Sequence, residues 1–357
     1  MKRITSALSI LLILATVLGL CACTKSTVIC ASCSAECDAN ASFCSFCGAI
    51  LTVATDTGTP EDPDNGLTRL EMGDINKAKL NHPDSATVIA ADNLVSKQTV
   101  LVDLSSSSVQ ASRLSNERIY PASMVKVMTL VVVVEQLKYE EKLQDVITIS
   151  EEVMKRMQKE GASGAGLEAG EQLTVESLLY ALILKSDGIA ACELANYVAG
   201  SETDFADLMN QKATEMGLTN SHFVNPTGLH DELQYSTCRD IAAIMAYAMS
   251  VPLCKKILST QVFVAPCVGA NGKQFNYTFY HSLLVTQFDK FKDQGKPYMP
   301  SNMTIIAGKT GYTPESGFCL VTCAKDTNGN LYVCVTAGAA SYAECVQDYR
   351  TVYGLAS

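Results

Sequence analysis

The residues best suited to chemistry are Ser123 and Lys126, which lie three positions apart in an almost wholly apolar run, residues 123–135. Four consecutive valines in this run favour a strand, but its length and the Pro-Ala-Ser sequence at its start favour a helix. We predict a buried helix, on which side chains three positions apart share one face. Burial disfavours the charged form of a lysine, and a neutral lysine can take the proton of a serine hydroxyl. The pair could therefore act as nucleophile and base, although Ser-x-x-Lys alone also fits an ordinary helix face.

Two further short motifs carry polar groups suited to a substrate site. The triplet Lys309-Thr310-Gly311 follows a strand-like apolar segment, residues 303–308. A cation and a hydroxyl on a strand can bind a carboxylate, and glycine lets a ligand backbone approach closely. The triplet Ser186-Asp187-Gly188 comes at the end of an apolar segment that we predict as a helix, and it offers a second serine hydroxyl.

The composition excludes a wholly disordered chain and argues against nucleic-acid binding. The chain has 357 residues, of which 48% are hydrophobic, so it can bury a large core. Its net charge is −10 at pH 7, whereas nucleic-acid binding needs clustered basic charge. Residues 86–91 and 99–104 are strand-like and are followed by a serine-rich turn at 105–108.

The N-terminus has the pattern of an export signal. Lys2 and Arg3 precede an uncharged apolar run, residues 7–20, which is too short to span a bilayer comfortably. The sequence Leu-Cys-Ala-Cys that follows resembles the lipobox of bacterial lipoproteins, in which the signal is cleaved before a cysteine that then carries a diacylglycerol. We expect residues 1–22 to be removed and Cys23 to be lipidated, which would anchor the exported protein at the outer face of the cytoplasmic membrane. An ordinary cleaved signal is the alternative.

Four cysteines after the signal form two CxxC pairs that are separated by ten residues. They are Cys30, Cys33, Cys44 and Cys47. Two such pairs can place four thiolates around Zn²⁺, and the end of the segment resembles a short zinc ribbon. So small a segment needs a metal or disulfides to hold a fold, and we expect a structural zinc within residues 23–50. Disulfides are the alternative in an exported protein, and they would leave Cys37 unpaired.

Residues 51–84 separate this cysteine module from the chemical motifs. The segment is acidic, rich in turn-forming residues and poor in large apolar ones. We interpret it as a flexible tether without a packed core. The motifs lie beyond it, so we predict one catalytic domain over residues 85–357.

The three motifs belong to a wider pattern along the chain, which comprises residues 120–129, 166–180, 223–229, 235–237 and 308–320. In content and order this pattern resembles the serine-type D-alanyl-D-alanine carboxypeptidases, or low-molecular-weight penicillin-binding proteins. The likeness covers about residues 86–357. It implies an α/β (α+β) fold of the β-lactamase and DD-peptidase type, an antiparallel sheet flanked by helices on both faces. It also implies removal of the terminal D-alanine from peptidoglycan stem peptides, sensitivity to β-lactams, and no cofactor for catalysis.

The resemblance further implies a role for each motif residue. Ser123 would attack the carbonyl of the penultimate D-alanine, with Lys126 as its general base. Ser186 would relay a proton to the departing D-alanine. The cation and hydroxyl of Lys309-Thr310-Gly311 would hold the terminal carboxylate, and the second cation would help to keep Lys126 neutral. The backbone N–H groups of Ser123 and Tyr312 match the family's oxyanion hole.

One motif departs from the family pattern. The middle motif is usually Ser-x-Asn, but position 188 is a glycine, which has no amide to contact the substrate. The loss of one such hydrogen bond could cost about 1–3 kcal/mol, or about 5- to 150-fold in rate. A non-catalytic lipoprotein that binds peptidoglycan or β-lactams is therefore an open alternative to an active carboxypeptidase.

A serine β-lactamase is a second alternative, which would need a glutamate to activate the deacylating water. Glu215 lies in a sequence that nearly matches such a motif. However, residues 204–216 are predicted as a helix between the capping Ser201 and Gly217. The family match also places this helix away from the site.

Other features of the sequence carry no motif. The eight cysteines beyond residue 190 lie in apolar or strand-like segments, and we predict mostly buried free thiols there. The four histidines show no metal-binding spacing. Many relatives add a β-rich domain and a C-terminal anchor, for which we expect no room in this chain, and the N-terminal lipid would replace that anchor.

Overall fold

The computed structural model describes residues 67–83, 85–285 and 299–356, and the backbone of four short strands outside these ranges. The chain divides into two units, Met1–Gly58 and Thr59–Ser357. In the first unit β1 (Thr27–Ile29) pairs antiparallel with β2 (Glu36–Asp38). Outside the described residues lie the predicted signal and the cysteines of the predicted lipid and zinc sites, namely Cys23, Cys30, Cys33, Cys44 and Cys47.

A six-stranded sheet organises the second unit, and its strands come from both ends of that unit. The order is β12-β13-β14-β4-β5-β3, with antiparallel neighbours except for β3 and β5. The pairing of Val100 with Val335 shows how an early and a late strand meet. The strands are β3 (Thr87–Val88), β4 (Gln98–Asp103), β5 (Ser108–Arg113), β12 (Met303–Thr313), β13 (Gly317–Asp326) and β14 (Leu331–Ala339).

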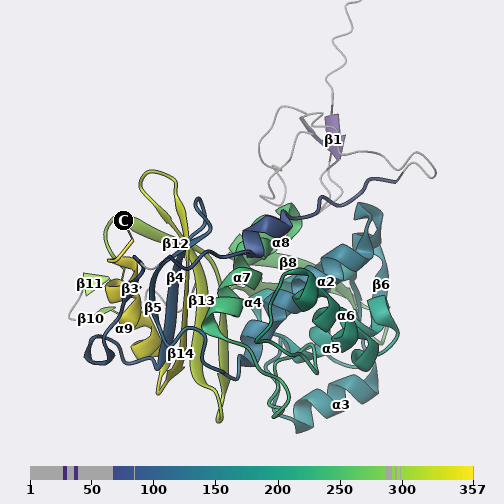
Figure 1. Cartoon of the computed structure of the whole chain (residues 1–357). Helices are drawn as coiled ribbons and strands as arrows, with labels where there is room; N and C mark the ends of the chain where they lie inside the picture. The colour runs from purple at the N-terminus through teal and green to yellow at the C-terminus, as the bar shows by residue number, and fades with distance from the viewer. Residues whose placement is uncertain are drawn as a thin grey trace, which may run out of the picture. The chain divides into compact units, whose positions relative to one another are not determined.

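Helices cover both faces of this sheet, as predicted (Figure 1). Side chains alternate between the faces of a strand, so neighbouring residues of β13 enter different layers. Leu320 packs in one cluster with Tyr349 and Tyr353 of α9 (Tyr342–Tyr353), whereas Val321 packs in the other cluster with α7 (Cys238–Ala248). Both layers exclude water, which explains why the central strands are apolar without alternation.

The predicted buried helix exists, but it begins later than expected. Residues Ala122–Val125 form a 3₁₀ turn, η3, and the α-helix α2 covers Lys126–Leu137. Every residue from 126 to 134 in α2 is buried, so the tertiary environment overrides the β preference of its four valines. The helices packed around α2 are α4 (Val175–Leu184), α5 (Gly188–Ala199), α6 (Glu202–Glu215), α7 and α8 (Pro252–Ser259).

The local signals at the ends of α6 act as the sequence predicted. The Ser201 hydroxyl accepts a hydrogen bond from the backbone N–H of Asp204 at 3.0 Å, which caps the helix. After the last turn, Gly217 adopts φ +74°, a conformation that glycine takes without strain. Of the remaining helical segments, α3 covers Glu151–Lys159, and the short 3₁₀ turns are η1 (Ile75–Ala78), η2 (Ala91–Asn93) and η4 (Glu140–Gln144).

A second, four-stranded sheet borders the helical region and was not predicted. Its order is β6-β7-β8-β9. Phe263 stacks on Tyr180 of α4 at 3.7 Å between ring centroids, which fastens the sheet to the helices. The strands are β6 (Val146–Thr148), β7 (Gln172–Thr174), β8 (Val262–Val268) and β9 (Gln274–Tyr280), and a separate pair is formed by β10 (Lys292–Asp293) and β11 (Lys296–Pro297).

Part of the segment interpreted as a tether instead packs on the domain. Leu70, Ala78 and Leu80 are buried in the main hydrophobic cluster. The backbone N–H of Leu70 donates to the carbonyl of Lys138 at 2.9 Å. The packed unit therefore includes residues from about 67 onward, because a few spaced apolar side chains in a polar segment suffice to dock it.

Within the described residues, no single helix is long and apolar enough to cross a membrane. The bent pair of α7 and α8 is long and apolar enough only when the two helices are taken together, and only by length and composition.

Candidate active site

Ser123 and Lys126 meet where the sheet edge and the helical region join. Ser123 lies in η3, one turn before Lys126 at the start of α2, and Lys126 Nζ donates to Ser123 Oγ at 3.1 Å. The preceding residue, Ala122, is buried and has φ +48°, which a non-glycine residue rarely adopts. Strain of this kind persists only where the surroundings fix the backbone, and such positions cluster at functional sites.

Lys126 is almost completely buried, at 2% exposed, yet its amine has polar partners. Besides Ser123, Nζ donates to the carbonyl oxygen of Thr227 at 2.5 Å. Burial lowers the pKa of Lys126 to about 8, while the nearby Asp187 and Cys192 act in the opposite direction. The amine therefore reaches its neutral form near physiological pH, as a base for Ser123 requires.

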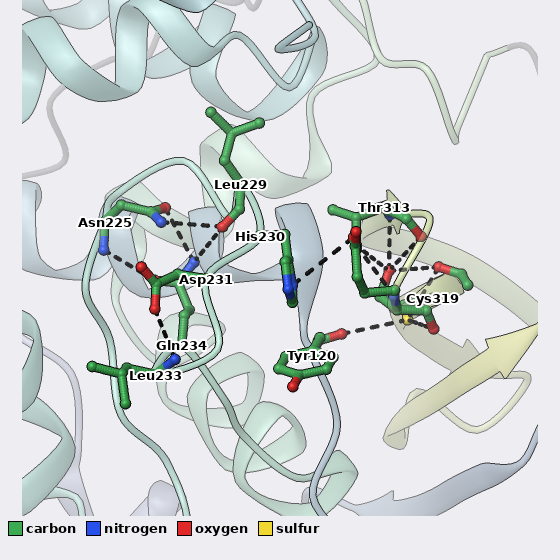
Figure 2. Close-up of polar contacts among 12 residues, drawn as sticks. Tyr120, Asn225, Leu229, His230, Asp231, Leu233, Gln234, Thr313 and Cys319 are labelled. Carbon is green, nitrogen blue, oxygen red and sulfur yellow. Dashed lines mark hydrogen bonds and ion pairs between the residues drawn. The ribbon is translucent and has the colours of Figure 1, made fainter. Parts of the chain in front are cut away.

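The Thr227 carbonyl is held by a rigid loop, which the sequence analysis matched to the family pattern without giving it a role. The Asn225 side-chain oxygen accepts from the backbone N–H groups of Thr227 (3.1 Å) and Gly228 (2.8 Å). The side chains of Asn225 and Gln234 both donate to the carbonyl of Leu229 (Figure 2). A Cβ at Gly228, where φ is +81°, would lie 2.1 Å from the Ala122 carbonyl oxygen. Glycine is thus required for this loop to approach the nucleophile turn.

His230 continues the same loop toward the turn after β12. Its Nδ1 lies 3.9 Å from Glu315 Oε2, and its ring packs edge-on against Tyr120 at 4.7 Å between centroids (Figure 2). The loop and the turn after β12 therefore face each other close to η3. No chemical role follows from this contact.

The Lys-Thr-Gly triplet lies on β12, the outer strand of the six-stranded sheet, as a strand prediction required. A Cβ at Gly311 would lie 3.0 Å from the Pro121 carbonyl oxygen and 3.2 Å from Ser123 N, so β12 touches the nucleophile turn through this glycine. Tyr312 follows, with its side chain 49% exposed and its ring stacked on Phe318 at 4.3 Å. Its exposure leaves the ring free to contact a substrate.

Lys309 and Ser186 meet although 123 positions separate them in the sequence. Lys309 Nζ donates to Ser186 Oγ at 2.9 Å and to the Thr310 carbonyl at 2.9 Å. Ser186 is buried and has φ +56° at the junction of α4 and α5. Burial, and then the positive charge of Lys126, hold the pKa of Lys309 well below its usual value. The three motifs thus form one site, in which the charge of Lys126 acts on Lys309.

A buried histidine that the sequence analysis left without a role lies beside Lys309. His281 is 1% exposed, and its Nδ1 accepts from the backbone N–H of Leu283 at 3.2 Å. Burial and the charge of Lys309 lower its pKa to about 3. It is therefore neutral at physiological pH. Nothing in its sequence neighbourhood signalled this contact.

The described residues also test the prediction made for the cysteines of the catalytic domain. The eight cysteines beyond residue 190 are all buried and free, as predicted. Among the described residues no cluster of three or more His, Cys, Asp or Glu side chains could hold a metal ion.

Gly188, which stands where the family usually has asparagine, is the first residue of α5 and packs closely against the loop before β7. Its N–H donates to the Ser163 carbonyl at 2.9 Å. A Cβ at this position would lie 2.8 Å from Ala162 Cβ and 3.1 Å from Met157 Sδ. The loop therefore occupies the space that a larger side chain at position 188 would take.

We expect Gly188→Ala to destabilise the protein by about 1–3 kcal/mol, because the added methyl group collides with Ala162. The sign is informative, since alanine is intrinsically the better helix former by about 1 kcal/mol. Urea denaturation of the variant measures the change. In a background that already carries Ala162→Gly, the same Gly188→Ala change should cost at most half as much stability. A Gly188→Ala variant that is more stable than the wild type would contradict the close packing.

With this geometry established, comparisons with known proteins define the class of the chain. A family model described as D-alanyl-D-alanine carboxypeptidase matches residues 85–340. The chain belongs to this family, and the expected recognition is confirmed at that level. D-alanyl-D-alanine carboxypeptidase DacF of Bacillus subtilis (strain 168) is 33% identical over 247 residues, which are 69% of this chain and 58% of DacF. DacC of Escherichia coli (strain K12) is 32% identical over 257 residues, 70% of this chain and 58% of DacC. The chain thus spans less than two thirds of the length of these curated relatives.

Solved structures agree on the fold. The crystal structure of the Streptomyces K15 DD-transpeptidase is 25% identical, with a TM-score of 0.65, and the match covers 73% of this chain and 97% of that one. A D-alanyl-D-alanine carboxypeptidase from Mycobacterium tuberculosis H37Rv is 22% identical, with a TM-score of 0.62 and coverage of 78% and 96%, and this likeness concerns the fold alone.

Proposed function

We propose that this protein is a serine DD-carboxypeptidase that removes the terminal D-alanine from peptidoglycan stem pentapeptides. The observation that carries the proposal is the buried Lys126 amine, 3.1 Å from the hydroxyl of Ser123 at the edge of β12. A nucleophile within hydrogen-bond reach of a base with a lowered pKa is the arrangement that acyl transfer needs. Membership of the family supports the choice of substrate.

In the acylation step, neutral Lys126 takes the Ser123 proton while Oγ attacks the carbonyl of the penultimate D-alanine. The backbone N–H groups of Ser123 and Tyr312 stabilise the oxyanion. When the peptide C–N bond breaks, the proton passes through Ser186 to the amine of the departing D-alanine. Lys309, beside Ser186 at 2.9 Å, and Thr310 hold the terminal carboxylate. Water then attacks the ester, gives a proton back through the same groups and releases the shortened peptide. The reaction needs no cofactor.

The test is D-alanine release from a stem pentapeptide ending in D-Ala-D-Ala, beside turnover of the chromogenic β-lactam nitrocefin. We expect D-alanine release, together with slow, stoichiometric acylation by β-lactams. Rapid nitrocefin turnover would favour a β-lactamase. Binding of the pentapeptide without release would favour a non-catalytic receptor, and either result would overturn the proposal.

The pH dependence of the reaction should follow the ionisation of Lys126. Its neutral form is the base, and its pKa is about 8, so kcat/KM should rise tenfold per pH unit below that value and level off above it. The profile of D-alanine release between pH 5.5 and 9.5 measures this midpoint. A flat profile, or a midpoint below pH 6, would show that a neutral Lys126 does not limit the reaction.

We further propose that the protein is exported and anchored to the outer face of the cytoplasmic membrane by a lipid on Cys23. The apolar run at residues 7–20 and the Leu-Cys-Ala-Cys sequence support this proposal. Labelling with a fatty acid should be sensitive to globomycin and absent from Cys23→Ser. No label on the wild type would exclude the anchor.

For the N-terminal cysteine module we propose a structural zinc site at Cys30, Cys33, Cys44 and Cys47, within residues 23–50. The two CxxC pairs and the small size of the segment support it. Zinc analysis of a 24–60 fragment, with and without reductant, should give one zinc per chain. Disulfides without zinc would contradict the proposal.

A further inference from the structure

A fully buried carboxylate lies between the two residues of the middle motif that have been discussed. Asp187 has no exposed surface, and it directly follows Ser186, the partner of Lys309. Its Oδ1 accepts from the backbone N–H of Ala190 at 2.7 Å, which caps α5. Its Oδ2 accepts from the backbone N–H of Ala165 at 2.5 Å, in the loop that also receives the N–H of Gly188. One side chain thus ties this loop to the start of α5.

Both oxygens of Asp187 accept backbone N–H groups, and hydrogen bonds of this kind favour the charged form of a carboxyl group. Burial acts in the opposite direction and raises its pKa, while the positive charge of Lys126 lowers it. Buried charges are costly unless they are paired. The carboxylate therefore needs a cation nearby, and Lys126 is that cation.

The groups that face the lysines show why a counter-charge matters. Lys126 is faced by Asp187, which caps α5, and by Cys192 within α5. Its charge also lowers the pKa of Lys309 on β12. Burial raises the pKa of the Cys192 thiol, and His281 beside Lys309 is neutral, so neither carries charge at pH 7. The carboxylate of Asp187 is therefore the counter-charge for protonated Lys126 in this buried group.

We propose that Asp187 is a positioning residue that holds the loop Ala162–Ala165 on the start of α5 and supplies the counter-charge of the buried Lys126. This inference rests on the proposed function, since it concerns the protonation of the base in that reaction. It gives Asp187, the middle residue of the Ser186-Asp187-Gly188 motif, a role in the site. The ordering of the loop and the protonation of Lys126 then depend on the same carboxylate.

The test is Asp187→Asn, with the rate of acylation by a fluorescent penicillin measured from pH 5.5 to 9.5. Removing the negative charge disfavours protonated Lys126, so the acid limb should move down by about one pH unit. The rate at pH 7 is best expressed as a fraction of each protein's own plateau rate. With a wild-type midpoint of about 8, this fraction should be about fivefold higher in the variant than in the wild type. A role limited to structure would lower the plateau without moving the midpoint, and that result would overturn the proposal.

Asp348→Asn is the matched control, because Asp348 is also a buried carboxylate that accepts two backbone N–H groups, from Val95 and Ser96. It belongs to α9 on the other face of the sheet, so its substitution should leave the midpoint unchanged. If Asp187→Asn does not fold, Asp187→Ser retains a capping oxygen without charge and should shift the midpoint equally. A wild type that neither reacts with penicillin nor releases D-alanine would instead overturn the proposed function.

Discussion

Replacing Ser123 with alanine is expected to abolish covalent labelling by penicillin and to reduce D-alanine release by at least about 10³-fold. The reason is chemical, because alanine has no atom that can form the acyl-enzyme, and the remaining groups cannot substitute for a nucleophile. The fold should persist, since Ser123 is only half-buried and contributes one side-chain hydrogen bond, from Lys126. Fluorescent-penicillin gels and a D-alanine assay measure the two effects.

Ser105→Ala is a suitable control for this variant, because Ser105 is exposed in the turn between β4 and β5, away from the three motifs. Its activity should equal that of the wild type. Release of D-alanine by a folded Ser123→Ala protein at more than a few per cent of the wild-type rate would show that another residue is the nucleophile.

Replacing Lys126 with arginine is expected to have the second largest effect, a loss of about 10³-fold in the acylation rate. Arginine keeps the positive charge and the hydrogen-bond donors, but its guanidinium does not lose a proton in proteins and cannot serve as the base. General base catalysis contributes about 10²–10⁴-fold, which sets the size of the expected loss. The residual rate should also lose the dependence on pH around 8 that the wild type is expected to show.

Lys212→Arg controls for the exchange of these side chains in a poorly exposed position. Lys212 lies at 12% side-chain exposure in ion pairs with Glu135 and Glu215, where a charged group is required rather than a neutral one. Its activity should therefore stay unchanged. Lys126→Met tests the same role without the bulk of arginine, and a Lys126→Met protein with near-wild-type acylation would exclude Lys126 as the base.

Local sequence was enough to predict several elements of the fold. The run of apolar residues after Ser123, the capping Ser201 before α6 and the strand that carries Lys309-Thr310-Gly311 all agree with the structure. Each depends on contacts between residues close in the chain, or on a strong apolar pattern. In the four-stranded sheet, β6 and β7 were missed because they are only three residues long, too short to give a periodic signal.

The sequence by itself determined the residue types of the site: a serine one turn before a lysine, a second serine, and a Lys-Thr-Gly strand. Only the tertiary structure decided that Lys309 Nζ would lie 2.9 Å from Ser186 and that the Thr227 carbonyl would receive the amine of Lys126. It also decided that Asp187 would be wholly buried near Lys126. These properties arise from segments distant in sequence that exclude water together, and the electrostatic effect of a charge depends on that exclusion rather than on the local sequence.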